Sequence, residues 1–289
     1  MLVNALVYGL ISSLTLAIIA SGLCLTLGVS GIPHLAIGGV YILSGYLCWT
    51  FLSLLGLPYL LAIVLSLLAA GLLGFIMYWV LLVRIRGTMS EVIVTFMAGI
   101  TILELLRWKG FVGFHYNLPT FIKGTFEIGQ VAIDWHRILL IGIASALLVF
   151  LWLFTRYTNV GRAFRGISQD ERTALTLGID SDWIGSLSMA SGSIIAAAAA
   201  ITVLPLETLQ IDKGYDVLIL ALAVGIVGGM ESRLGIVIAS LMLGYIQTFV
   251  GIYISTHWMM ITIFAAIILI LSLKPSGLFG KFKELEERV

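Results

Sequence analysis

Long runs of apolar residues fill most of the chain, and turn residues such as Gly56 and Pro58 separate several of them. A helix needs about 20 apolar residues to cross the hydrocarbon core of a bilayer. The runs predict nine spans, near residues 3–28, 34–55, 58–83, 90–110, 137–156, 182–204, 216–230, 234–253 and 257–273. The seventh run is short, which favours a partial or tilted helix. The pattern predicts an all-α polytopic membrane protein of about eight or nine transmembrane helices in one domain, residues 1–289.

The composition supports this class. Hydrophobic residues make up 60% of the chain, charged residues make up 11%, and the mean hydropathy is +1.12. These values exclude a soluble globular domain. The net charge of +1 comes from scattered basic residues, so nucleic acid is not expected as a partner. No pair of His or Cys residues has the spacing of metal ligands, so no metal site is predicted.

One charged segment interrupts the apolar pattern. Residues 156–182 contain eight charged side chains, whereas residues 1–83 contain no Asp, Glu, Lys or Arg. Such a cluster is costly in lipid and is expected to lie in water. Ser168 and Glu171 have the spacing of a capping box, and Gly178 suits the left-handed residue that closes a helix. We therefore predict a helix of about nine residues here, which either docks a soluble partner or is a solvated loop that fixes topology.

The distribution of Lys and Arg predicts the orientation, because basic residues are enriched on the cytoplasmic side. With the charged segment inside, eleven of the 16 basic residues lie inside and five outside. The prediction is an N-terminus outside and a C-terminus in the cytoplasm. The inner set is Arg84, Arg86, Arg156, Arg162, Arg165, Arg172, Arg233, Lys274, Lys281, Lys283 and Arg288, and the outer set is Arg107, Lys109, Lys123, Arg137 and Lys213.

The longest outer connection covers residues 111–136. Its glycines and the alternation around Thr125 to Ile133 predict a small β-hairpin. This hairpin could cap the outer mouth of a solute path, or the connection could be a simple surface loop.

The charged segment resembles the cytoplasmic loop of the permease subunits of branched-chain amino acid ABC importers. That loop reads approximately Gly-Arg-Ala-x-Arg-Ala-x-x-Gln-Asp-Arg-Glu-Ala-Ala-x-x-x-Gly-Ile in the family. This chain has Gly161-Arg162-Ala163-Phe164-Arg165-Gly166, then Gln169-Asp170-Glu171-Arg172-Thr173-Ala174, then Gly178-Ile179. Glu171 and Arg172 reverse the family's order of charges, and Thr173 replaces a small Ala, so the partner's groove should differ in charge detail.

Three further motifs follow the family's order along nearly the whole chain. The first is His34-Leu35-Ala36-Ile37-Gly38, where the family has Asn-Phe-Ala-His-Gly. The second begins at Gly228-Gly229 and departs from the family's Gly-Gly-x-Gly-Ser-x-Pro-Gly turn at Glu231 and Leu234. The third is Lys274-Pro275-Ser276-Gly277-Leu278-Phe279-Gly280, where the family has Arg-Pro-x-Gly-Leu-Phe-Gly. The length fits the shorter of the two permease types that such importers pair.

The resemblance implies a permease of a prokaryotic plasma membrane that carries leucine, isoleucine or valine. Its implied partners are a second permease subunit, two cytoplasmic ATP-binding subunits, which bind the ATP, and an external solute-binding protein. The chain itself is expected to be no enzyme and to hold no cofactor. Its loop, residues 157–181, would be the coupling helix that inserts into the ATPase, through Gly161, Arg162, Arg165, Ser168, Gln169, Asp170, Glu171, Arg172, Ala174 and Gly178.

The residues alone also favour an external source of energy. A carrier driven by ion gradients usually buries ionisable residues in its spans. Here, apart from charged residues at the extreme ends of the spans, only Glu104 and Arg107 lie within one, near its outer end. At i and i+3 they can form an ion pair, or they could contact substrate. No Gly-x-x-x-x-Gly-Lys-Ser/Thr motif occurs, so no P-loop nucleotide site is predicted in the chain.

The solute path is the least defined prediction. The sixth span is rich in small residues, which pack helices closely and can also line a path. The candidates for the path are His34, Gly38, Glu104, Ser191 and Ser193. The alternatives to a branched-chain amino acid permease are an ABC permease for urea, short amides or another small solute, and a self-sufficient secondary carrier or channel. A membrane scaffold is a third possibility.

Overall fold

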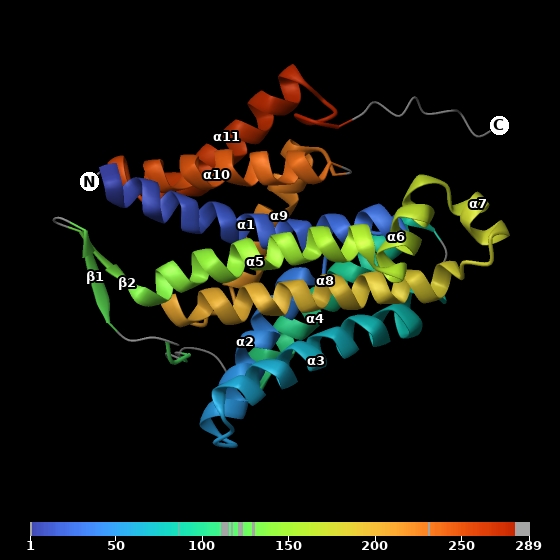
Figure 1. Cartoon of the computed structure of the whole chain (residues 1–289), viewed down its shortest axis with the longest axis horizontal. Coiled ribbons are helices and arrows are strands. Elements are labelled where there is room, and N and C mark those ends of the chain that lie inside the picture. The colour runs from blue at the N-terminus through green and yellow to red at the C-terminus, as the bar shows by residue number, and fades with distance from the viewer. Residues whose placement is uncertain are drawn as a thin grey trace.

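Each of the nine predicted spans is a helix in the computed structural model (Figure 1). The structure describes residues 2–85, 87–110, 116, 118–120, 124–128, 131–230 and 232–280. The helices are α1 (Leu2–Ser30), α2 (Ile37–Ser53), α3 (Tyr59–Met77), α4 (Thr88–Trp108), α5 (Trp135–Tyr157), α8 (Ser181–Val203), α9 (Lys213–Gly228), α10 (Arg233–Tyr253) and α11 (Trp258–Leu273). A π-helical turn, Tyr78–Leu82, extends α3, and a 3-10 turn, Leu204–Leu206, extends α8.

Helix length separates these spans into two groups. Within the described residues, six helices are long and apolar enough to cross a membrane: α1, α3, α4, α5, α8 and α10 with their extensions. The apolar helices α2 and α11 are shorter. The seventh predicted span is α9, whose 16 residues extend about 24 Å at 1.5 Å per residue, less than the roughly 30 Å of a hydrocarbon core.

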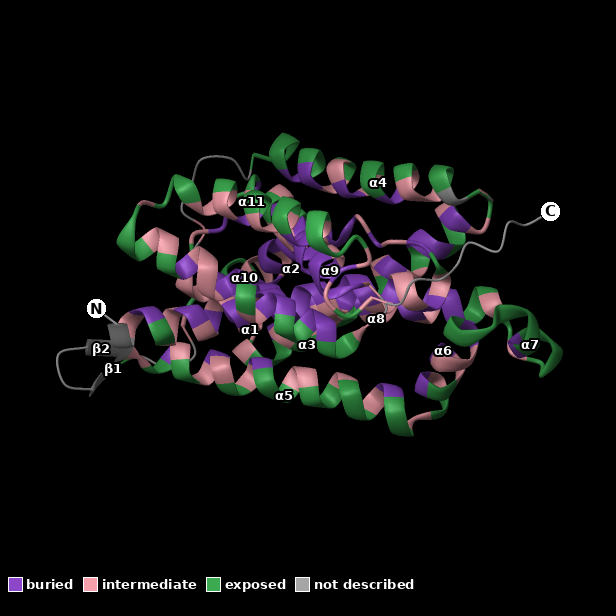
Figure 2. Ribbon diagram, turned by 90° about the horizontal axis from the view of Figure 1, so that it is seen from above, coloured by how far each residue is buried: buried purple, intermediate pink, exposed green. Residues whose placement is uncertain are grey.

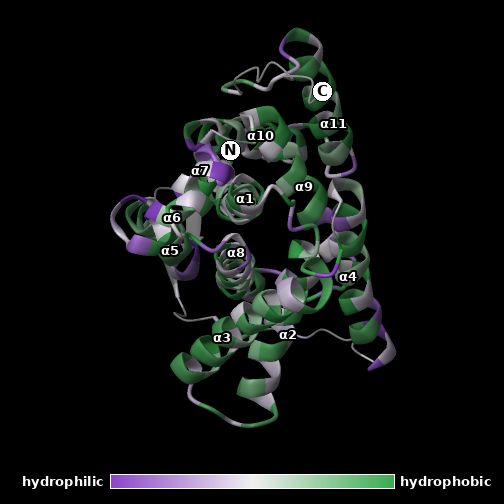
Figure 3. Ribbon diagram, turned by 90° about the vertical axis from the view of Figure 1, so that its right-hand side faces the viewer, coloured by the Kyte–Doolittle hydropathy of each residue, from purple (hydrophilic) through white to green (hydrophobic). Residues whose placement is uncertain are grey.

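Helices α1 and α8 lie at the centre of the bundle, and the others surround them (Figure 3). Burial shows the same arrangement, because 61% of the apolar window of α1 and 67% of that of α8 are buried, against 17% for α5 (Figure 2). α1 packs along α10, α8 and α9, and α8 also packs along α3 and α2. The outer helices therefore present apolar side chains such as Leu68 and Phe150 outward, as expected for surfaces in lipid.

Small residues allow the central helices to approach one another. A Cβ added to Gly22 of α1 would lie 3.2 Å from the Gly192 oxygen of α8, and one added to Gly74 of α3 would lie 2.7 Å from the Met189 oxygen. Four alanines of α8, Ala196, Ala197, Ala199 and Ala200, are fully buried. Close backbone contact of this kind holds helices together where lipid removes the hydrophobic drive. The close packing predicted from the small residues of the sixth span is confirmed, and its lining of a path stays a prediction.

The two ends of the bundle carry different structures (Figure 1). At one end lies the predicted hairpin, with β1 (Thr125–Ile128) antiparallel to β2 (Val131–Asp134), so that prediction is confirmed. At the opposite end lies the charged segment. Other parts of the predicted outer connection, residues 111–115, 117, 121–123 and 129–130, lie outside the described residues, as do Arg86, Glu231 and residues 281–289.

Gly38 offers a test of the close packing between α2 and α9. A Cβ there would collide with the Gly214 oxygen and lie 3.0 Å from the Gly214 carbonyl carbon. Gly38→Ala is expected to destabilise the protein by about 1–3 kcal/mol, because neither backbone can yield easily. Thermal unfolding in detergent measures the change. Gly142→Ala on α5 is the matched control, since no atom lies within 4 Å of its added Cβ. Equal unfolding temperatures for the two variants would contradict this packing.

Candidate functional site

The charged segment forms two helices, α6 (Asn159–Gln169) and α7 (Glu171–Thr176). Thr158 begins α6, because its hydroxyl accepts a hydrogen bond of 3.0 Å from the Gly161 amide. Only Asp170 separates α6 from α7, and its backbone is extended. The prediction of a single helix of about nine residues is wrong. The first half of the segment is amphipathic and forms the separate helix α6, and α7 has only six residues.

The predicted capping box at Ser168 is also wrong. Ser168 lies in the last turn of α6, and the residue that caps α7 is Asp170. Its carboxylate accepts hydrogen bonds from the amides of Arg172, at 3.0 Å, and Thr173, at 3.3 Å. The Glu171 carboxylate accepts from the Ser181 hydroxyl at 2.6 Å instead of returning to Ser168. Burial of the inner face of α6 carries that helix past Ser168, and Asp is a strong N-cap at the next break.

Hydrogen bonds stabilise the charged form of this cap. The Thr173 hydroxyl, the Thr173 amide and the Arg172 amide all donate to the Asp170 carboxylate, and they lower its pKa below the ordinary 3.8. Because the pKa is lower in the folded state, the cap stabilises α7 fully above the ordinary value. The stabilisation is lost as the pH falls through the lowered pKa. Asp170 is therefore ionised at neutral pH.

Gly178 closes α7 in the predicted left-handed conformation, with φ of +83°. Its amide donates to the Leu175 oxygen at 3.0 Å, and the Ile179 amide donates to the Ala174 oxygen at 3.1 Å, which together form a Schellman motif. Asp180 then caps α8 by accepting from the amides of Asp182 and Trp183. The connection from α7 to the central helix α8 is thus short and hydrogen-bonded at both ends.

The inner face of the segment packs on the central helices. Phe164 and Ile167 of α6 and Ala174 of α7 form a buried cluster with Val29 of α1 and Ile184 of α8. Gly161 is also buried, where a Cβ would lie 2.5 Å from the Thr155 Cα. Two of the predicted coupling residues, Gly161 and Ala174, therefore support the segment from inside and present no outer surface.

The outer face carries the other predicted residues and two that the sequence reasoning missed. Arg162, Ser168, Gln169, Asp170, Glu171, Arg172 and Gly178 are exposed, and Arg165 is partly buried. Leu175 and Leu177 are also exposed, by 49% and 76% of their surface. Hydrophilic residues, coloured purple in Figure 3, occur on α6 and α7 at this end of the bundle. A six-residue helix can bury only one face, so the two leucines that follow the inward Ala174 were a usable signal.

Two of the predicted path residues meet in the interior. The His34 Nε2 and the Ser193 hydroxyl are 2.9 Å apart, and both side chains are fully buried. The other ring nitrogen, His34 Nδ1, has no partner among the described residues. Gly38 lies one turn further along, in the contact with α9. Ser191 is partly buried and donates to the Leu187 oxygen of its own helix.

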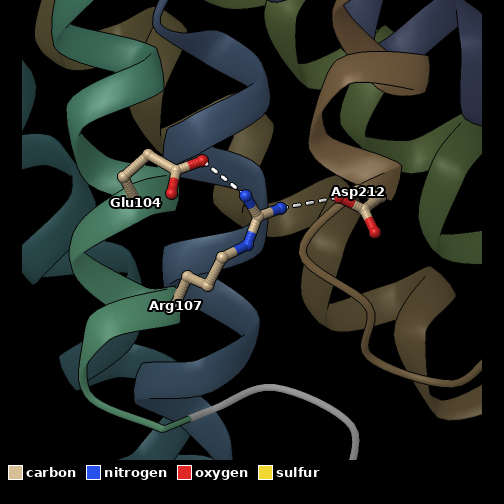
Figure 4. A network of polar contacts seen from close by, with 3 residues as sticks. All are labelled: Glu104, Arg107 and Asp212. Carbon is tan, nitrogen blue, oxygen red and sulfur yellow. Dashed lines mark hydrogen bonds and ion pairs between the residues drawn. The ribbon is translucent and has the colours of Figure 1, made fainter.

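Glu104 does not join this group. It lies near the far end of α4, 48% exposed, and accepts a hydrogen bond from Arg107 at 2.7 Å (Figure 4). Arg107 also bonds to Asp212, before α9, at 2.8 Å. The predicted i,i+3 ion pair is confirmed, while Asp212 was missed because it is distant in sequence. Exposed pairs like these contribute at most about 1 kcal/mol, so the network is a surface link between α4 and α9.

The glycine turn and the last motif form one unit at the end that carries α6. The Leu278 amide donates to the Val227 oxygen at 2.8 Å, and the Phe279 amide donates to the Gly228 oxygen at 3.2 Å. Gly229 has a φ of +88°, and a Cβ there would lie 2.5 Å from the Gly280 nitrogen. Position 229 therefore requires glycine, because any side chain would be strained at this φ and would collide with the backbone of Gly280.

Residues 5–273 match the family model described as the permease component of the branched-chain amino acid transport system. The chain is 27% identical to the high-affinity branched-chain amino acid transport system permease protein BraD of Pseudomonas aeruginosa, over 96% of this chain and 95% of that protein. It is 25% identical to the corresponding protein LivH of Salmonella typhimurium, over 92% of each.

The fold resembles a solved one. The structure of PsaBC from Streptococcus pneumoniae in complex with Fab matches with a TM-score of 0.54 and 14% identity, over 94% of this chain and 92% of that chain. At this identity the similarity concerns the fold.

The cap of α7 gives a test that separates Asp170 from Ser168. Asp170→Ala removes the acceptor for two amides, so the amides of Arg172 and Thr173 are expected to exchange hydrogen several-fold faster. Ser168→Ala is expected to leave both unchanged, because Ser168 belongs to α6. Hydrogen exchange at neutral pH, where the Asp170 carboxylate is ionised, measures both. The assignment of the cap would be contradicted if these amides exchanged faster in Ser168→Ala, or if their exchange in Asp170→Ala were as slow as in the unchanged protein.

Proposed function

Because the chain belongs to the family of permease components of branched-chain amino acid transport systems, we propose that it forms one half of the membrane pathway of an ATP-driven importer. The second half is another permease subunit, of the longer type. Two cytoplasmic ATPases and an external binding protein complete the assembly. The proposed substrates are leucine, isoleucine and valine, because the names of the relatives describe those proteins as permeases for branched-chain amino acids.

The observation that carries this proposal is the construction of the α6–α7 segment. It projects from the end of the bundle, is capped at both helix ends, and is joined to α8 by a short hydrogen-bonded link. Its outer face combines charged side chains with the exposed Leu175 and Leu177. Such a surface suits a groove in a soluble partner. Movement of that partner would reach α8 through the link and reorient the helices around the path.

The orientation follows from the same segment. The permease would lie in a prokaryotic plasma membrane. If α6 and α7 bind an ATPase on the cytoplasmic side, the hairpin at the other end of the bundle faces outward, as does the start of α1 (Figure 1). This agrees with the excess of basic residues predicted for the inner side.

A self-sufficient carrier has less support. Ion-coupled carriers use buried ionisable residues in their spans, whereas Glu104 and Arg107 neutralise one another at the surface (Figure 4). A permease for urea or short amides has the same architecture, so only transport assays distinguish it. The largely apolar interior suits branched aliphatic side chains, and much of the specificity is expected to come from the binding protein.

The proposal predicts transport that depends on the partners. The chain is purified with its co-purifying subunits and reconstituted in liposomes containing ATP. Labelled leucine should accumulate only when the ATPases, ATP and the binding protein are present, and urea should not compete. Flux through the chain alone, driven by an ion gradient, would support the carrier instead. Uptake of urea that leucine does not inhibit would support the other permease class.

The exposed Leu175 of α7 and Leu177, which directly follows this helix, give a more local prediction. Leu175→Asp combined with Leu177→Asp is expected to weaken ATPase binding by about 2 kcal/mol or more, roughly 30-fold, as for central interface residues. Co-purification and substrate-stimulated ATP hydrolysis measure this loss. Leu54→Asp is the matched control, because Leu54 is 71% exposed in the turn between α2 and α3, away from α7. Normal coupling in the double variant would refute docking through α7.

A further inference from the structure

A groove opens on the side of the bundle next to the charged segment. It has a volume of about 740 Å³ and is bounded by α1, α5, α6 and α10. Its walls include the apolar side chains of Leu148, Leu151, Leu234 and Val237. Two arginines, Arg165 of α6 and Arg233 of α10, also line it, and the described residues around it include no Asp or Glu.

The two guanidinium groups are fixed by hydrogen bonds, and no carboxylate among the described residues neutralises them. Arg165 Nη2 donates to the Arg156 oxygen at 3.0 Å, and Arg233 Nη1 donates to the Thr155 hydroxyl at 2.9 Å. Arg165 Nε is buried and has no partner in the described part of the chain. Neither arginine forms an ion pair with a described residue. Each guanidinium has five N–H donors, so most of their hydrogen-bonding capacity remains for an anion.

Exposed aromatic residues beside the arginines indicate the depth of lipid headgroups. Their anchors, Thr155 and Arg156, belong to the last turn of α5, where Trp152 and Tyr157 are exposed and Arg156 stacks on both rings. Exposed Trp and Tyr near the end of a spanning helix mark the membrane interface. Leu148 and Leu151 lie one to two turns deeper on the same helix. The charged and apolar parts of the groove are thus arranged as in a phospholipid, with its anionic group at the interface and its chains in the hydrocarbon.

We propose that this groove binds a phospholipid with an anionic headgroup from the leaflet on the side of α6 and α7. The phosphate and its headgroup accept hydrogen bonds from Arg165 and Arg233, and an acyl chain lies between α5 and α10. Basic pockets between spanning helices bind anionic lipids elsewhere for the same physical reason. The bound lipid links α6 to α10, so it holds the charged segment against the bundle. The proposal does not depend on which solute is carried.

Brominated lipids provide the test, because they quench tryptophan fluorescence on contact and Trp152 lines the groove. The chain, with its co-purifying subunits, is placed in bilayers containing brominated phosphatidylglycerol or brominated phosphatidylcholine. The contribution of Trp152 is obtained by subtracting the signal of Trp152→Phe. Phosphatidylglycerol is expected to quench Trp152 at a lower mole fraction than phosphatidylcholine.

The variants assign this preference to the two arginines. Arg165→Gln and Arg233→Gln are each expected to reduce it about fivefold, the effect of one basic residue near an anionic membrane surface. Arg233→Lys keeps the charge and should retain most of it. Arg162→Gln is the matched control, because it removes an equal charge from α6 outside the groove. Equal loss in Arg162→Gln would show a general surface charge effect and overturn the site.

Three other results would also overturn the proposal. The first is equal quenching by both lipids in the unchanged protein. The second is loss of the preference in millimolar inorganic phosphate, which would identify a site for a soluble anion. The third is quenching of the isolated chain that disappears in the whole assembly, which would show that another subunit covers the groove.

Discussion

The contact between α1 and α8 is the interaction on which the other features depend. Gly22 and Gly192 bring the two backbones together, since a Cβ on Gly192 would lie 3.1 Å from the Gly22 oxygen. In lipid this packing cannot rely on the hydrophobic effect, so it depends on small residues and close van der Waals contact. The outer helices arrange around this pair, and the charged segment is anchored to both of its members through Val29 and Ile184.

This anchoring explains how a small helix outside the spans could influence the interior. On its own, a helix of six residues is marginal in water. Here Asp170 caps its start, Gly178 closes its end, and Ala174 packs inward. Ser193, which meets His34 in the interior, lies on the same helix that Asp180 begins. In the proposed mechanism, a displacement of α7 would act on α8, and the hydrogen bond between Ser193 of α8 and His34, in the connection between α1 and α2, would have to adjust.

The spans, the hairpin and the turn at Gly178 could be predicted from the sequence because each depends on local composition or spacing. The features that were missed depend on residues distant in sequence. Ser168 has the spacing of a cap, yet the packing of Phe164 and Ile167 extends α6 through it. The pairing of His34 with Ser193 joins residues 159 positions apart, and that of Arg107 with Asp212 joins residues 105 apart. No local pattern contains such pairs.

Arg165 shows how the structure changes the interpretation of a predicted site residue. In the sequence it belongs to the same charged motif as Arg162, and both were expected to contact the partner. In the structure Arg162 is exposed, whereas Arg165 is partly buried, bonded to the end of α5 and directed to the groove beside α10. Its guanidinium is held by the bundle and cannot reach the outer face of α7 without breaking that bond. In the proposed importer, Arg165 would therefore support coupling by keeping α6 in place, and direct contact with the ATPase would fall to α7 and Arg162.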